Sequence, residues 1–158
     1  MSYKIILDSC GEIPADLKND ERFTNVALSI QVAEENIVDD ETFDQADFLK
    51  KVAACPNAPK SSCPSPDSYL QAMKGEAEEV YVVTLTSELS GSYNSAVLAK
   101  NLFEEENEEK KIYIFNSKSA SCGETQIALA IAECKEAGME FEAVIEKIEK
   151  FIDDMDTY

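Results

Sequence analysis

The sequence predicts an α/β fold in which helices cover both faces of a mostly parallel sheet. Short apolar runs rich in β-branched residues recur along the chain, and helical patterns lie between them. These runs span residues 5–7, 26–32, 80–85 and 112–115. Strands that alternate with helices form parallel sheets with both faces covered. The length of 158 residues suits one compact domain.

The first helix is predicted after the second apolar run. Thr42 or Asp44 can act as its N-cap, because short polar side chains accept hydrogen bonds from the first free N–H groups of a helix. Phe48, Leu49 and Val52 then share one face. We therefore expect an amphipathic helix that begins near residue 45.

The second and third helices carry clear start signals. Ser65 and Pro66 are typical of an N-cap followed by the first helical position, and Gly75 is expected to stop this second helix. The third helix is expected to follow residues 90–92. Its apolar register consists of Tyr93, Ala96, Val97, Ala99 and Leu102. It runs into the acidic stretch 104–109, which we interpret as a solvated helix end and loop.

Two late helices complete the predicted fold. The apolar face of the first consists of Ile127, Ala130, Ile131 and Cys134, and this helix is expected to end at Gly138. The apolar face of the second consists of Phe141, Val144, Ile145, Ile148 and Ile152. Stripes at this spacing are typical of core packing, so neither helix is assigned a cofactor.

The charge balance disfavours several classes of partner. The chain has 14 Lys plus Arg against 32 Asp plus Glu, a formal charge of -18. This charge repels nucleic acid, anionic lipid surfaces and polyphosphates, while a protein partner with a basic face stays open. No apolar run approaches the roughly 20 residues that span a bilayer. We expect no nucleic-acid binding and no membrane span.

The residue inventory argues against catalysis and metal binding. Histidine is absent, which removes the usual general base near neutral pH and the commonest metal ligand. The five cysteines are odd in number and scattered, so neither a disulfide framework nor a zinc site is indicated. A reducing, cytoplasmic location fits such thiols. We assign no catalytic residue and no metal ligand.

Polar motifs follow the predicted strands. Asp8 and Ser9 come after the first strand, residues 86–92 after the third, and Asn116 and Ser117 after the last. In open α/β sheets ligands bind outside the carboxyl ends of the strands, where the loops of several units converge. We therefore expect these loops to line one crevice.

Two of the loops are candidates for ligand binding. Ser90, Gly91 and Ser92 lie at a helix amino terminus, where free N–H groups and the helix dipole favour an anion. The alternative is ordinary serine capping. Ser61 and Ser62 lie in the segment 60–66, whose prolines fix its shape and leave hydroxyls free to bind. The alternative there is a capped proline turn without a ligand.

These loops suit a single carboxylate. They supply hydroxyl and amide donors but, apart from Lys60 and Lys118, almost no cations. The dinucleotide and phosphate-loop glycine motifs are both absent, so nucleotide binding is disfavoured and no cofactor is predicted. We expect Asp8 to hold the loops, because its charge would oppose a bound carboxylate. Cys63 is interpreted as a small buried side chain.

The motifs resemble, in order, those of the DegV family. Residues 4–14 resemble its opening strand and Asp-Ser-Thr-x-Asp-Leu-Pro motif, and residues 26–32 its second strand. Residues 61–66 are similar to Thr-Ser-Gln-Pro-Ser-Pro, residues 87–96 to Ser-x-x-Leu-Ser-Gly-Thr-Tyr-x-Ser-Ala, and residues 116–123 to Asp-Ser-x-x-x-Ser-x-Gly. The departures are Ser61 and Ser92 for threonine, Cys63 for glutamine and Asn116 for an acid.

The resemblance implies a two-lobed fold that holds a long-chain fatty acid in a tunnel. Ser61 and Ser90 take the places of the family's carboxylate-binding threonine and serine. Such proteins present the acid to a separate fatty acid kinase that makes the acyl phosphate, and perform no bond-making step themselves. Residues 1–158 then correspond to the amino-terminal lobe, and the second lobe is absent from this chain.

Two other interpretations stay open at this point. One is an enzyme in which a serine or Cys63 is the nucleophile and a missing lobe supplies the base. The other is a regulatory module that binds no ligand and acts through its acidic surface.

Overall fold

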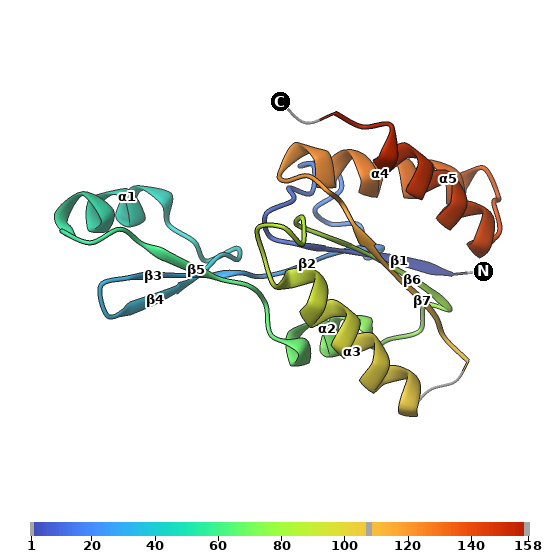
Figure 1. Ribbon diagram of the computed structural model, residues 1–158, viewed down its shortest axis with the longest axis horizontal. Coiled ribbons are helices and arrows are strands. Elements are labelled where there is room, and N and C mark those ends of the chain that lie inside the picture. Colours follow the sequence, from blue (N-terminus) through green and yellow to red (C-terminus); the bar gives the residue numbers. More distant parts are fainter. Residues whose placement is uncertain (1, 107–108, 157–158) are drawn as a thin grey trace.

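The computed structural model describes residues 2–106 and 109–156, which form a main body and a projecting arm (Figure 1). The body contains one parallel sheet in the order β2-β1-β6-β7. Its strands are β1 (Tyr3–Asp8), β2 (Phe23–Val26), β6 (Glu79–Thr84) and β7 (Lys111–Asn116). Every pairing in this sheet is parallel.

Helices cover both faces of the parallel sheet (Figure 1). One face carries α2 (Pro66–Met73) and α3 (Ser92–Glu106), and the other carries α4 (Cys122–Glu136) and α5 (Phe141–Asp153). The predicted fold class is therefore confirmed. No helix among the described residues combines the length and the apolar character needed to cross a membrane.

The core consists of two apolar layers, one on each face of the sheet. Successive strand residues point to opposite faces, so Ile5 and Leu7 pack toward α4 and α5 while Ile6 packs toward α2 and α3. All six residues of β6 are buried, as expected for a central parallel strand. The main helical residues in these layers are Tyr69, Met73, Ala96, Ala99, Phe103, Ile127, Ile131, Val144, Ile148 and Ile152.

The arm was not predicted. It contains an antiparallel sheet of β3 (Ser29–Val32), β4 (Glu35–Val38) and β5 (Lys60–Ser62), with α1 (Gln45–Ala54) beside it (Figure 1). The apolar run 26–32, predicted as one strand, is split between the two sheets: Val26 ends β2 and Ser29 begins β3. The polar alternation of Ser29 and Gln31 suits an antiparallel strand with one solvated face.

The helix starts follow the predicted caps. Asp44, one of the two candidates, accepts a hydrogen bond from the Asp47 N–H at 3.0 Å. Ser65 accepts from the Ser68 N–H at 3.1 Å and is followed by proline, as predicted. The second helix ends at Met73, before Gly75, whose φ is +112°.

The apolar faces of two helices differ from expectation. None of the residues of α1 is buried, and Leu49 is 58% exposed, because α1 packs only within the arm. In α3 the last core residue is Phe103, and the neighbouring Leu102 is exposed. The predicted acidic helix end is helical through Glu106, while residues 107–108 lie outside the described residues.

Candidate functional site

The carboxyl ends of three neighbouring strands lie at one edge of the parallel sheet. The strands β1, β6 and β7 end at Asp8, Thr84 and Asn116, and their parallel pairing brings these ends together. The loops that follow them therefore converge at this edge, as predicted. We call this region the carboxyl edge.

Asp8 links the loops of the carboxyl edge from a buried position at the end of β1. Its side chain is fully buried, and its Oδ2 accepts hydrogen bonds from the Leu85 N–H at 2.8 Å and the Ser92 hydroxyl at 2.6 Å. Its Oδ1 accepts from the Cys10 N–H at 3.2 Å. One carboxylate thus joins the end of β1, the end of β6 and the start of α3.

The Ser92 hydroxyl lies inside the protein and not at the ligand surface that the sequence suggested. Ser92 is fully buried, and its proton goes to Asp8. The hydroxyl oxygen of Tyr69 lies 2.6 Å from the Ser92 hydroxyl oxygen. Because the Ser92 proton is used in the bond to Asp8, Tyr69 is the donor in this second bond. Burial, followed by the charge of Asp8, raises the pKa of Tyr69 and keeps it protonated. In place of a ligand contact, Ser92 anchors the amino terminus of α3.

Ser90 and Gly91 lie nearer to solvent at the start of α3. The Ser90 hydroxyl oxygen accepts a hydrogen bond from the Ser92 N–H at 3.1 Å, which fixes the oxygen and leaves the Ser90 proton available to an acceptor. Gly91 is exposed, and its N–H donates no hydrogen bond within the described part of the chain. These two groups are neutral donors at the positive end of the helix dipole.

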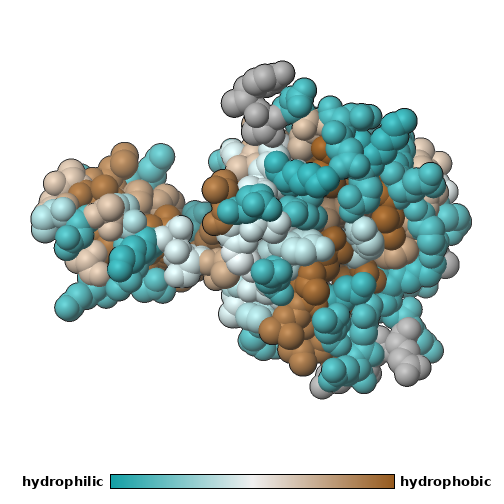
Figure 2. Space-filling view, in the orientation of Figure 1, coloured by the Kyte–Doolittle hydropathy of each residue, from teal (hydrophilic) through white to brown (hydrophobic). Residues whose placement is uncertain are grey.

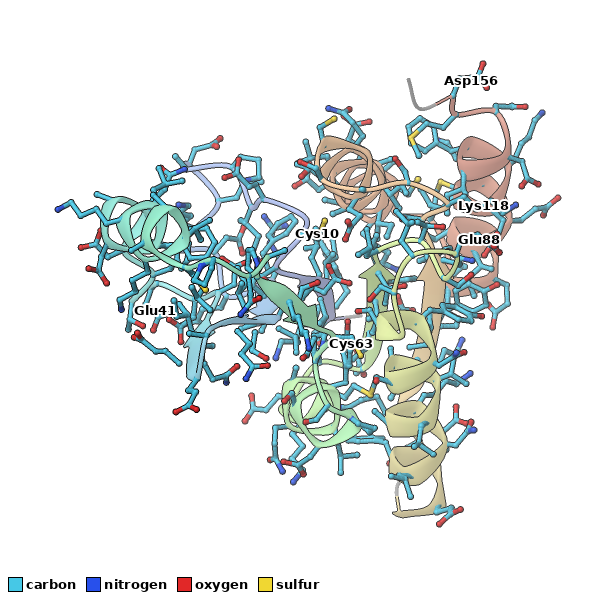
Figure 3. The ribbon with its side chains drawn as sticks, turned by 60° about the vertical axis from the view of Figure 1, so that its left-hand side comes forward. Cys10, Glu41, Cys63, Glu88, Lys118 and Asp156 are labelled. Carbon is cyan, nitrogen blue, oxygen red and sulfur yellow. The ribbon has the colours of Figure 1, made fainter. Side chains whose placement is uncertain are left out.

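The segment after β5 meets the start of α3. A Cβ built on Gly91 would lie 3.1 Å from the Cys63 sulfur, a contact too close for most side chains, so glycine permits this approach. The Cys63 sulfur also lies 3.9 Å from the Ser95 hydroxyl oxygen. Figure 3 labels Cys63 where the chain after β5 approaches α3. Ser61 and Ser62, both exposed, directly precede this contact.

Residues 61 and 90 therefore belong to segments that lie on the same side of the molecule. Ser61 pairs with Ile30 inside the antiparallel sheet, so the arm and the body each contribute one hydroxyl segment. Residues 60–62, predicted as part of a loop that leads into the second helix, form the strand β5. Figure 2 shows apolar side chains, mixed with polar ones, on the surface of the arm.

The other predicted loop residues hold segments together. The Ser9 hydroxyl donates to Asp39 at 2.7 Å and accepts from the Leu28 N–H at 3.0 Å, which ties β1 to the entrance of the arm. Asn116 Oδ1 accepts from the Ser87 N–H at 3.1 Å, and its Nδ2 donates to the Ser87 hydroxyl at 2.8 Å.

Ser117 is fully buried and orders its own turn. Its hydroxyl donates to the Ser119 carbonyl at 2.9 Å and accepts from the Ser119 N–H at 3.1 Å. The adjacent cation, Lys118, forms an ion pair with Asp153 of α5. The lysine beside this loop is therefore engaged in an ion pair, whereas Lys60, the other cation near the candidate loops, begins β5 next to Ser61.

Sequence reasoning missed two residues beneath this site, Tyr69 and Glu124. Tyr69 lies within the second predicted helix, and its position in the sequence gives no sign of where its hydroxyl points. Glu124 could have been noticed as the last residue of a Ser-x-x-Glu capping box, which it forms with Ser121. Glu124 is fully buried, and burial together with the nearby charge of Asp8 raises its pKa to about 9.

Comparisons with known proteins agree on one family. A family model described as an uncharacterised protein of the DegV family matches residues 2–158. A DegV domain-containing protein of Streptococcus pneumoniae is 41% identical over 152 residues, which cover 94% of this chain and 53% of that protein. The chain thus spans about half the length of the curated relatives it matches.

Solved structures give the same result. A DegV family protein of Ruminococcus gnavus, solved with vaccenic acid, has a TM-score of 0.93 and 53% identity, over 96% of this chain and 55% of that one. The Streptococcus pneumoniae fatty acid kinase (Fak) B3 protein, loaded with linoleic acid, has a TM-score of 0.86 and 37% identity, over 97% and 55%. The chain therefore belongs to the DegV family.

Proposed function

We propose that this chain supplies one wall of a fatty-acid-binding site and acts as a lipid carrier. In this proposal Ser61, Ser62, Ser90 and Gly91 bind the carboxylate, and the loaded protein presents it to a separate fatty acid kinase. The approach of the Cys63 segment to Gly91 carries the proposal, because it brings the two hydroxyl segments to one place.

The chemistry of the donors supports a carboxylate as the ligand group. A fatty acid carries a single negative charge, which hydroxyl protons and free helix N–H groups can bind without a fixed cation. Hydrogen bonds to a charged acceptor are worth about 1.5–3 kcal/mol each. In this account Asp8, Ser92 and Tyr69 do not touch the ligand, and they keep the start of α3 in position.

The surface next to these donors supports an apolar tail. Leu89 directly precedes Ser90 and is 78% exposed, so its side chain is free to contact the apolar tail of a ligand bound at Ser90. Solved relatives contain vaccenic acid and linoleic acid. We propose that residues 1–158 form the amino-terminal lobe and that a second lobe covers the other side of the tail.

The kinase role rests on one relative and on the residue inventory. The Streptococcus pneumoniae relative is named as a fatty acid kinase B3 protein. The present chain has no histidine. Phosphoryl transfer by a separate enzyme is the interpretation that requires no catalytic base here.

Lipid extraction tests the proposal. The full-length protein, which includes the proposed second lobe, is purified from cells without added lipid, extracted with organic solvent, and the extract analysed by mass spectrometry. We expect fatty acids in amounts close to one per protein, and acyl phosphate when the loaded protein is mixed with ATP and a fatty acid kinase. Lack of any acyl chain, together with no thermal shift on adding fatty acids, would reject the carrier function.

A further inference from the structure

Two carboxyl groups lie side by side beneath the candidate site. Asp8 and Glu124 are each 0% exposed. One carboxylate oxygen of each, together with the Cys10 sulfur, lies within 4.8 Å of the other two atoms. Figure 3 labels Cys10 in the body, near the end of β1. Glu124 comes from the first turn of α4, so the pair joins two elements that are far apart in sequence.

The hydrogen bonds of the two carboxyl groups differ. Asp8 accepts from Leu85, Ser92 and Cys10, so all its neighbours donate and its charged form is satisfied. Glu124 accepts from the Ser121 N–H at 3.1 Å through Oε1, while no N–H or hydroxyl group among the described residues donates to its buried Oε2. A buried polar atom without a partner costs about 1–3 kcal/mol.

A proton on Glu124 would supply the hydrogen bond that its buried Oε2 lacks. Asp8 and Glu124 are both 0% exposed, so two charges on these adjacent carboxyl groups would repel each other strongly, and a proton on one of them removes that repulsion. A protonated Glu124 becomes a donor, and Asp8 is the acceptor beside it. We propose that Glu124 is held as a neutral acid that donates its proton to Asp8. We further propose that this shared proton makes Glu124 a positioning residue for the site at the start of α3.

The groups that face Glu124 favour this arrangement. Asp8 and Cys10 face it from the end of β1, and Tyr69 approaches from α2. Burial, with a smaller contribution from Glu124, raises the pKa of Cys10 to about 11, and the pKa of Tyr69 is also raised. With Cys10 and Tyr69 protonated, a proton on Glu124 limits the cluster to a single negative charge near neutral pH. A second charge would weaken the hold of Ser90 and Gly91 on an anion.

Stability against pH tests the shared proton without any ligand. Folded Glu124 keeps its proton up to about pH 9, whereas the unfolded chain releases it near 4.5. The folded state binds more protons in this window, so stability falls as pH rises through it. The folding constant of the wild type, relative to Glu124→Gln, should fall by up to about tenfold per pH unit. Glu124→Gln stays neutral and can still donate to Asp8.

The control is Glu133→Gln, which changes an exposed glutamate on the same helix. We expect it to keep the wild-type pH dependence. Equal pH slopes for the wild type and Glu124→Gln would overturn the proposal. So would a gain in stability on adding Zn²⁺ that a chelator reverses, because a metal would then occupy the place of the proton.

Carbon-13 NMR of labelled glutamate carboxyl groups gives a second test on the wild type alone, in case a variant fails to fold. One glutamate carboxyl should keep its proton up to about pH 9. If no glutamate carboxyl changes its protonation near that pH, the proposal is wrong.

The positioning role rests on the proposed function and needs a binding measurement. Oleate affinity of the wild type should drop by about tenfold when Glu124 ionises, and that of Glu124→Gln should stay flat. Glu124→Leu, which cannot donate to Asp8, should bind more weakly than Glu124→Gln at every pH.

If no variant binds oleate but the NMR result holds, the carrier function fails and the shared proton stands. If the wild type binds oleate with no change in affinity as Glu124 ionises, the positioning role fails alone.

Discussion

Replacing Lys135 with methionine is expected to lower the free energy of unfolding by about 3–5 kcal/mol. The Lys135 ammonium lies 2.7 Å from Glu79 Oε2, and the two side chains are only 8% and 1% exposed. The Tyr81 hydroxyl donates to the same oxygen at 2.9 Å. Methionine keeps the length of the side chain but leaves a carboxylate buried at the start of β6 without its cation. Urea denaturation near pH 7 measures the loss.

The matched control removes both charges. In Glu79→Gln with Lys135→Met no buried ion is left unpaired, so most of the lost stability should return, because a neutral pair is often close in stability to a buried ion pair. The pair lies at the end of the sheet opposite the candidate site, since Glu79 begins β6 and Thr84 ends it. Equal losses in the single and double variants would contradict this account.

Asp8→Ala is expected to destabilise the protein about as much as Lys135→Met does, and also to abolish ligand binding. The substitution leaves the Leu85 N–H, the Ser92 hydroxyl and the Cys10 N–H without their acceptor. Unsatisfied buried donors cost about 1–3 kcal/mol each, so we expect a loss of about 4 kcal/mol in urea denaturation. The start of α3 also loses its anchor, and with it the position of Ser90.

The control for this variant is Asp154→Ala, which removes an exposed carboxylate after α5. It should leave both stability and binding close to wild type, as surface substitutions usually do. A fully stable Asp8→Ala protein with unchanged affinity would remove Asp8 from its supporting role.

Local signals in the sequence predicted most of the fold. The Ser65-Pro66 start of α2 and the apolar stripes of α4 and α5 depend on neighbouring residues only, and the structure agrees with them. The convergence of the strand ends at Asp8 and Asn116 followed from the parallel sheet. These features could be predicted because helix capping and periodicity act over a few residues.

Features set by distant contacts could not be predicted. The run 26–32 looks like one strand, yet a hydrogen bond from the Leu28 N–H to Ser9, distant in sequence, lies where the chain leaves one sheet for the other. The inward turn of the Ser92 hydroxyl depends on Asp8 and Tyr69, which belong to other elements. The protonation of Glu124 likewise depends on its neighbours in space.

Discrimination between an acid and an alcohol with the same tail tests whether the proposed site recognises a carboxylate. Oleic acid and oleyl alcohol differ only at the head group, and we propose that Ser90 and its neighbouring donors bind a carboxylate. The wild type should prefer the acid. Ser90→Ala should lose about 1–3 kcal/mol of affinity for the acid and little for the alcohol, because a charged acceptor then lacks one donor. Equal affinity of the wild type for the two lipids, or an unchanged preference in Ser90→Ala, would show that these donors do not bind the carboxylate.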